Sequence, residues 1–371
     1  MHIAVFHRPD AHTTGNYFRK ALAEAHTVSF LSEDFALGKR AHNSFDLVKY
    51  VAQQAVDLVL CIDPICGFFP LGLESIPCPT AIYLIDVHRG LSERLKLALF
   101  FDAVCVAQHD YVEIVKDQGI ENAFWLPLAC DPDFHSSVQQ VQEKRYEIGF
   151  VGHKGAGNGD RSKVLDILSS QFKLNDLNRW YSPEDIGVVY YLSHMVFNWS
   201  VNGDVNMREF EALCSGRLLL TNAIGNGLER LFTDREHLVV YRNVEELQSL
   251  VRYYLAHPEE REKIARAGRA EVLKKHTYRC RSAQILDTIS CSEKISKSAA
   301  VRHWSAKQKW ETYAQVFANL RQPLSAYRVA AHALGRSEVT LKLLLCVVTA
   351  GLRAINAQIP LTPNAIRSRI G

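Results

Sequence analysis

Short apolar runs alternate with longer amphipathic runs over the first 135 residues, and this alternation constrains the fold most. Continuous apolar strands separated by helices are typical of a parallel sheet covered on both faces. We expect strands at Ile3–Phe6, Thr27–Leu31, Leu58–Ile62, Thr80–Ile85, Ala103–Ala107 and Ala123–Leu126. We expect helices between them at Tyr17–Ala25, Ser44–Gln54, Leu91–Phe101 and Asp110–Gly119. The pattern predicts a doubly wound α/β unit, in which ligands bind at the carboxyl ends of the strands.

A second α/β unit follows the polar stretch 136–144. Its expected strands are Tyr146–Val151, Val188–Trp199, Arg217–Thr221 and Leu238–Tyr241, and its expected helices are Arg161–Leu168, Met207–Cys214, Glu245–Ala256 and Pro258–Lys275. The sequence therefore predicts two Rossmann-like domains that face a central cleft, followed by a helical tail. The predicted boundaries are 1–140, 145–288 and 289–371 for the first domain, the second domain and the tail.

A glycine-rich loop joins the first strand and helix of the second unit. It begins Gly152-His153-Lys154 and leads to Arg161 at the start of the helix. Backbone N–H groups and the positive end of a helix can face a diphosphate at such a loop, and Arg161 can add a charge-assisted hydrogen bond. The loop has neither the spacing of the dinucleotide fingerprint nor a Gly-Lys-Ser/Thr sequence. A flexible surface turn is the alternative interpretation.

A helix and a buried strand are predicted between Asn206 and Asn222. Arg208 and Glu211 are three residues apart, so they share one face near the start of that helix. A glutamate there can accept hydrogen bonds from both hydroxyls of a ribose, and an arginine there can contact the diphosphate. The alternative is a solvated salt bridge between the two side chains, which is common on helices.

Several motifs together resemble a known family. Asn206-x-Arg-x-Phe-Glu-Ala is followed by Cys214-x-Gly and by Thr221-Asn222, with Glu236-His-Leu-Val-Val-Tyr and Lys275-His-Thr-Tyr downstream. This order resembles the donor domain of GT-B glycosyltransferases, most closely the spore-maturation CgeB-like group with its group 1-type C-terminal domain. The resemblance covers residues 1 to 285. It implies a metal-independent, retaining transfer of a sugar from a nucleoside diphosphate to an acceptor hydroxyl, with no cofactor besides the nucleotide sugar. The residues expected to bind the donor are Gly152, His153, Lys154, Arg161, Asn206, Arg208, Glu211, Asn222 and Gly225.

One position departs from the pattern of retaining members. They often carry a second glutamate eight residues before the one matching Glu211, and that position is Gly203, with Asp204 beside it. The departure keeps open a rival function from another class, a non-catalytic protein that binds a nucleotide sugar or a glycan on the same scaffold.

Asp86 and His88 follow an apolar strand at the end that faces the predicted cleft. Either side chain could take a proton from an acceptor hydroxyl, and we expect them to be the catalytic residues. The alternative is that Asp86 only caps the next helix. Asp131-Pro132-Asp133 superficially matches the metal motif of another glycosyltransferase fold, but its place favours a structural turn, and we expect no metal site.

Composition excludes some other functions. The net charge of +3 over 371 residues gives no general case for nucleic-acid binding. Nine scattered cysteines, several inside apolar runs, favour a reduced, cytoplasmic protein. No uncharged apolar segment has the length of about 18 residues that a spanning helix needs. We expect a glycan, lipid-linked or protein acceptor as partner, with peripheral membrane contact through the tail as a further possibility for residues 289–371.

Overall fold

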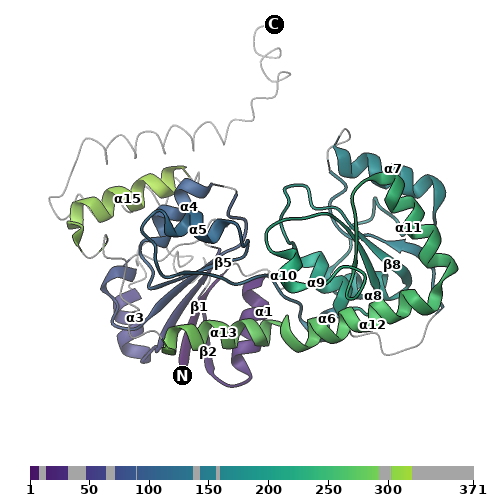
Figure 1. Ribbon diagram of the computed structural model, residues 1–371. Coiled ribbons are helices and arrows are strands. Elements are labelled where there is room, and N and C mark those ends of the chain that lie inside the picture. Colours follow the sequence, from purple (N-terminus) through teal and green to yellow (C-terminus); the bar gives the residue numbers. More distant parts are fainter. Residues whose placement is uncertain are drawn as a thin grey trace, which may run out of the picture.

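The computed structural model describes residues 1–7, 14–31, 47–63, 72–88, 90–136, 143–155, 159–291, 301 and 303–319. The chain forms two separate sheets, each wholly parallel and each flanked by helices (Figure 1). This arrangement confirms the α/β class and the two-sheet organisation expected from the alternating pattern.

The first sheet has six strands in the order β2-β1-β3-β4-β5-β6. Its strands are β1 (His2–Phe6), β2 (Thr27–Leu31), β3 (Leu58–Ile62), β4 (Thr80–Leu84), β5 (Ala103–Val106) and β6 (Ala123–Trp125). The helices between them are α1 (Thr14–Ala23), α3 (Leu47–Gln54), α4 (Leu91–Ala98) and α5 (Tyr111–Lys116). Every residue of β3, β4 and β5 is buried. Helices cover both faces of these central strands, which explains why their sequences are almost continuously apolar.

The second sheet has four strands in the order β10-β9-β8-β7. Its strands are β7 (Tyr146–Gly149), β8 (Ser193–Asn198), β9 (Leu218–Asn222) and β10 (Val239–Tyr241). Its helices are α7 (Asp160–Gln171), α8 (Pro183–Tyr191), α9 (Met207–Cys214), α10 (Leu228–Leu231), α11 (Val244–Ala256) and α12 (Pro258–Lys275). The carboxyl ends of the strands face the first unit, as expected for a ligand-binding edge.

The predicted strand at Val188–Trp199 is wrong in its first part. Residues 188–191 form the last turn of α8, and β8 begins at Ser193. The β-branched and aromatic residues of this segment favour a strand locally. However, Ser182 and Asp185 form a capping box and Pro183 occupies the first turn, so a helix is already established upstream.

Three helices connect or cover the units. The short α6 (Pro132–His135) follows the first sheet and packs against α8 and α9 of the second unit. The helix α13 (Tyr278–Cys291) lies in the sequence range expected for the second domain, yet it packs on α1 of the first unit (Figure 1). The helix α15 (Ala306–Asn319) packs on α4, where Tyr313 stacks on Phe100 with ring centroids 4.1 Å apart.

The predicted helical tail is therefore described only as far as α15, and residues 320–371 lie outside the described part of the chain. In the described residues, no helix is both long and apolar enough to span a bilayer.

Candidate functional site

A cavity of about 500 Å³ opens between the two units at the carboxyl ends of their strands. Its lining residues come from both units: Asp86, His88, Arg161, Trp199, Ser200, Val201, Asn202, Asp204, Asn206, Met207, Arg208 and Glu211. Six of the predicted site residues thus share one cavity, namely Asp86, His88, Arg161, Asn206, Arg208 and Glu211. The lining is mainly polar and charged, which suits a hydrophilic ligand.

The start of α9 is fixed by a capping box. Asn206 accepts a hydrogen bond from the backbone of Arg208, and the Glu209 carboxylate accepts one from the backbone N–H of Asn206 at 3.0 Å. Glu209 is fully buried, and burial raises the pKa of its carboxyl to about 8. The capping box fixes the start of α9 at the cavity wall, where Arg208 lies on the first turn and Glu211 follows three residues later.

Arg208 is held on three sides. Its Nε donates to the carbonyl of Val151 at 3.0 Å, and its Nη1 donates to Oδ1 of Asn198 at 2.5 Å. The guanidinium also lies over the ring of Phe150, 4.7 Å from the centroid. Gly152 has a φ of +148°, and a Cβ there would overlap Nη2 of Arg208. Glycine at 152 therefore gives the guanidinium its space, and the side chain is preorganised before any ligand arrives.

A second guanidinium lies beside the first. Arg161, at the start of α7, lines the same cavity, and its pKa is lowered by burial and by the charge of Arg208. Two neighbouring cations in a partly buried site repel each other, and a bound anion between them would relieve that repulsion. This wall of the cavity is therefore suited to a diphosphate.

Glu211 is buried, with 8% of its surface exposed, and it faces the cavity. Its Oε1 lies 3.6 Å from Nε2 of His135, a fully enclosed side chain on α6. The backbone N–H of Asp131 donates to Nδ1 of His135 at 3.0 Å, so the proton of the neutral ring is on Nε2 and faces Glu211. Burial lowers the pKa of His135, which keeps this imidazole neutral. The salt bridge between Arg208 and Glu211 considered from the sequence is absent from the ion pairs of the described residues.

The first unit contributes the loop after β4. Asp86 is not the cap of α4, because the N-cap of that helix is Gly90. The backbone of Asp86 instead hydrogen-bonds to Asp63, which pairs with the buried Arg94 at 2.8 Å. Burial raises the pKa of Asp63, and Arg94 opposes that rise. The Asp63–Arg94 pair thus fixes the loop that carries Asp86 and His88.

The other predicted donor residues lie outside the cavity lining. Lys154 pairs with Asp166 of α7 at 2.7 Å, and His153 accepts a hydrogen bond from the backbone of Gly155. Asn222 hydrogen-bonds the backbone of Ser200 at 2.8 Å, so it supports the cavity wall from behind. Gly225 lies close to Asp110 of the first unit. A Cβ added to Gly225 would be 3.4 Å from the Asp110 carboxylate.

The structural turn expected at Asp131-Pro132-Asp133 is confirmed. Asp131 is the N-cap of α6, and Lys20 binds both carboxylates. Among the residues that the structure describes, no cluster of His, Cys, Asp or Glu has the arrangement of a metal site.

Sequence reasoning missed the residue that organises the site. Asn198, at the end of β8, accepts from Arg208 and donates to Glu209 at 2.6 Å and to Thr221 at 3.0 Å. The one sequence signal that could have identified Asn198 is its position as a polar residue at the carboxyl end of an apolar strand. Trp199, Ser200, Val201, Asn202 and Met207 also line the cavity without having been predicted.

Comparison with known proteins bears on the second unit and on the fold. Residues 138–287 match the family model described as glycosyl transferase-like. No curated protein sequence matches the chain. HepE of Anabaena, solved in complex with UDP, is 13% identical and superposes with a TM-score of 0.54 over 78% of this chain and 100% of its own. A glycosyltransferase from Rickettsia africae is 11% identical, with a TM-score of 0.56 over 78% of this chain and 97% of its own.

The sucrose-phosphate synthase of Thermosynechococcus elongatus is 12% identical, with a TM-score of 0.54 over 77% of this chain and 97% of its own. At these identities the likeness establishes the fold. The chain therefore has the GT-B fold, and residues 138–287 match the glycosyl transferase-like family model.

Proposed function

We propose that the protein is a glycosyltransferase that moves a sugar from a nucleoside-diphosphate sugar to an acceptor hydroxyl. The observation that carries the proposal is the cavity itself, which is lined by two guanidiniums and a buried glutamate together with Asp86 and His88. UDP is the first donor nucleotide to test, because HepE was solved with UDP and with UDP-glucose. The CgeB-like grouping and the transfer of a hexose are finer parts of the same proposal.

The second unit would hold the donor. Arg208 and Arg161 would neutralise the diphosphate, and Glu211 would accept the hydroxyls of the ribose. Preorganised cations stabilise the negative charge that develops on a leaving diphosphate, so this transfer would proceed without a metal ion. Asp86 and His88 would face the acceptor. A closed cleft would keep water from the donor and limit its hydrolysis.

The acceptor remains a glycan, a lipid-linked glycan or a protein, and the peripheral membrane contact and cytoplasmic location expected from the sequence remain predictions. Retention of the anomeric configuration rests on the family resemblance alone. Gly203 takes a left-handed conformation with a φ of +73°, so a turn occupies the position of the partner glutamate.

That glycine also favours the rival function, a protein that binds nucleotide sugars without turnover. Two measurements on the full chain separate the functions. Thermal shift with UDP, GDP, TDP and CDP sugars identifies the nucleotide, because a ligand that binds only the native state raises the melting temperature. Release of the nucleoside diphosphate with an acceptor present then tests catalysis. Binding without release supports the rival function, and no binding of any of the four refutes both.

A further inference from the structure

A buried carboxylate lies beside the arginine of the cavity wall. Glu209 has no exposed surface and does not line the cavity, and the proposed transfer does not use it. Its Oε1 accepts a hydrogen bond from Nδ2 of Asn198 at 2.6 Å, and its Oε2 accepts one from the backbone N–H of Asn206 at 3.0 Å. Because a buried carboxylate is costly unless donors satisfy it, both N–H groups are needed to keep Glu209 in place.

The amide of Asn198 connects Glu209 to Arg208. Nη1 of Arg208 donates to Oδ1 of Asn198 at 2.5 Å, and a guanidinium can only donate, so the amide oxygen faces the guanidinium. The amide nitrogen then faces Glu209 and also donates to Oγ1 of Thr221 at 3.0 Å. Nδ2 of Asn206 donates to the same amide oxygen at 3.4 Å. All four hydrogen bonds that a side-chain amide can make are therefore present.

The Glu209 carboxylate determines which way this amide points. If the amide turned over, its nitrogen would face the guanidinium of Arg208, and two donors would meet. Its oxygen would face the carboxylate, and two acceptors would meet. The Thr221 hydroxyl does not discriminate between the two orientations, because a hydroxyl can donate or accept. Glu209 therefore keeps an acceptor opposite Arg208.

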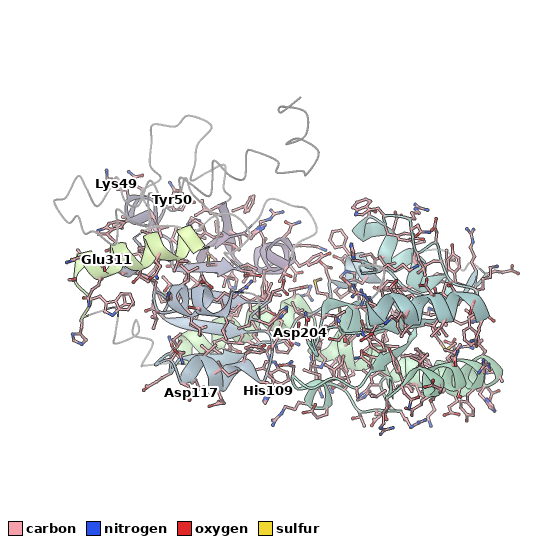
Figure 2. All side chains as sticks on the ribbon, turned by 90° about the horizontal axis from the view of Figure 1, so that it is seen from above. Lys49, Tyr50, His109, Asp117, Asp204 and Glu311 are labelled. Carbon is pink, nitrogen blue, oxygen red and sulfur yellow. The ribbon has the colours of Figure 1, made fainter. Side chains whose placement is uncertain are left out.

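The same carboxylate fixes the backbone of Arg208. Oε2 of Glu209 holds Asn206, whose Oδ1 accepts a hydrogen bond from the backbone N–H of Arg208 at 3.0 Å. Asn206 and Asp204 both line the cavity, and Figure 2 shows Asp204 where the two units meet. Glu209 thus acts on both ends of Arg208, on the guanidinium through one asparagine and on the backbone through the other.

We infer that Glu209 is a positioning residue, which sets the affinity of the second unit for a diphosphate by orienting Arg208. This inference rests on the proposed donor site. Nε and Nη1 of Arg208 are bound to Val151 and Asn198, so these two hydrogen bonds set the direction of the remaining N–H groups. Charge-assisted hydrogen bonds to phosphate depend on that direction. A guanidinium that is held in place before binding also loses less conformational freedom when the diphosphate arrives.

The test compares the Kd of the nucleoside diphosphate with the Kd of the nucleoside, by calorimetry on the full chain with the nucleotide identified by thermal shift. Burial raises the pKa of Glu209 to about 8, so the titrations are made at about pH 9, where the carboxylate is present. Glu209→Gln allows the Asn198 amide to turn over, because an amide can donate as well as accept. The Kd for the nucleoside diphosphate should rise by roughly tenfold or more, and the Kd for the nucleoside by less than about twofold.

Two combined variants show whether the effect passes through Arg208. In an Arg208→Ala background, Glu209→Gln should cause no further loss of affinity for the nucleoside diphosphate, because the two changes remove the same interaction. The exchange variant combines Asn198→Asp with Glu209→Gln. Its new carboxylate can accept from Arg208 and from the new amide, and the oxygen of that amide can accept from Asn206. The exchange variant should therefore bind the nucleoside diphosphate more tightly than either of its single variants.

Asp185→Asn is the matched control. Asp185 completes the capping box of α8 as Glu209 completes that of α9, but Asp185 does not line the cavity. Loss of a capping carboxylate alone should leave both Kd values at those of the wild type.

Three results would overturn the inference and leave the donor site intact. They are an unchanged Kd for the nucleoside diphosphate in Glu209→Gln, an equal rise of the Kd for the nucleoside, and an exchange variant that binds no better than its single variants. If Glu209→Gln does not fold, the exchange variant should still fold and bind the nucleoside diphosphate, and its failure to fold would overturn the inference. A wild-type protein that binds no nucleoside diphosphate would instead refute the proposed function.

Discussion

Glu211 is the residue at which the donor-site assignment is most open to refutation. Glu211→Gln keeps the size of the side chain and removes its charge. A hydrogen bond to a charged group contributes about 1.5 to 3 kcal/mol, and about 1.4 kcal/mol corresponds to a tenfold change in affinity. If Glu211 binds the ribose, the Kd for the nucleoside diphosphate should rise by roughly 10- to 100-fold. Glu211 is enclosed beside His135, so solvent should weaken this effect little.

Isothermal titration calorimetry with the full chain measures this change. Glu245→Gln is the matched control, since Glu245 is exposed in the first turn of α11 and does not line the cavity. The Kd of the Glu245→Gln variant for the nucleoside diphosphate should equal that of the wild type. The melting temperature of each free variant separates a binding defect from a folding defect. An unchanged Kd in a folded Glu211→Gln would refute the assignment of Glu211 to the ribose.

Three further predictions concern the groups around the site. Gly152→Ala should weaken nucleoside diphosphate binding with little effect on nucleoside binding, because the new Cβ displaces Arg208; equal Kd values for wild type and variant in calorimetry would contradict this. Arg94→Met should lower the free energy of unfolding by about 3 to 5 kcal/mol in urea titration, because it leaves Asp63 buried without its partner. A loss below about 1 kcal/mol, which is the contribution of an exposed ion pair, would show that Asp63 is solvated. Burial, and secondarily Arg281, lower the pKa of His276 to about 4, so the unfolded state binds the proton first as the pH falls. Stability from this group is complete above about pH 6.5 and is lost between about pH 6.5 and 4, which His276→Asn should show as a shallower pH dependence of unfolding.

Local sequence determined the elements and the edge of the sheet where the site lies. The apolar runs of β3, β4 and β5 are buried on both faces, which only a central parallel strand requires. The start of α9 was predictable for the same kind of reason, since Asn206 and Glu209 form a capping box from residues three positions apart. Arg208 and Glu211 line the cavity, and their binding of the donor stays a prediction. Residues 188–191 were wrongly predicted as a strand. Their side chains favour a strand locally, but they continue the helix that begins at the capping box of Ser182 and Asp185.

Tertiary structure decided which side chains meet. His88 and Asp204 are 116 positions apart in number, and they line one cavity because contacts such as those of Gln108 and Asn226 hold the two units together. Lys154 had the charge expected of a phosphate ligand, but it pairs with Asp166 at 2.7 Å and does not line the cavity. The hydrogen bonds that Asn198 makes to Arg208, Glu209 and Thr221 likewise exist only once β8, α9 and β9 are assembled. Propensity and capping depend on residues a few positions apart, so they can be judged from the sequence. A site depends on contacts between segments that are distant in the sequence, and those contacts form only when the chain is folded.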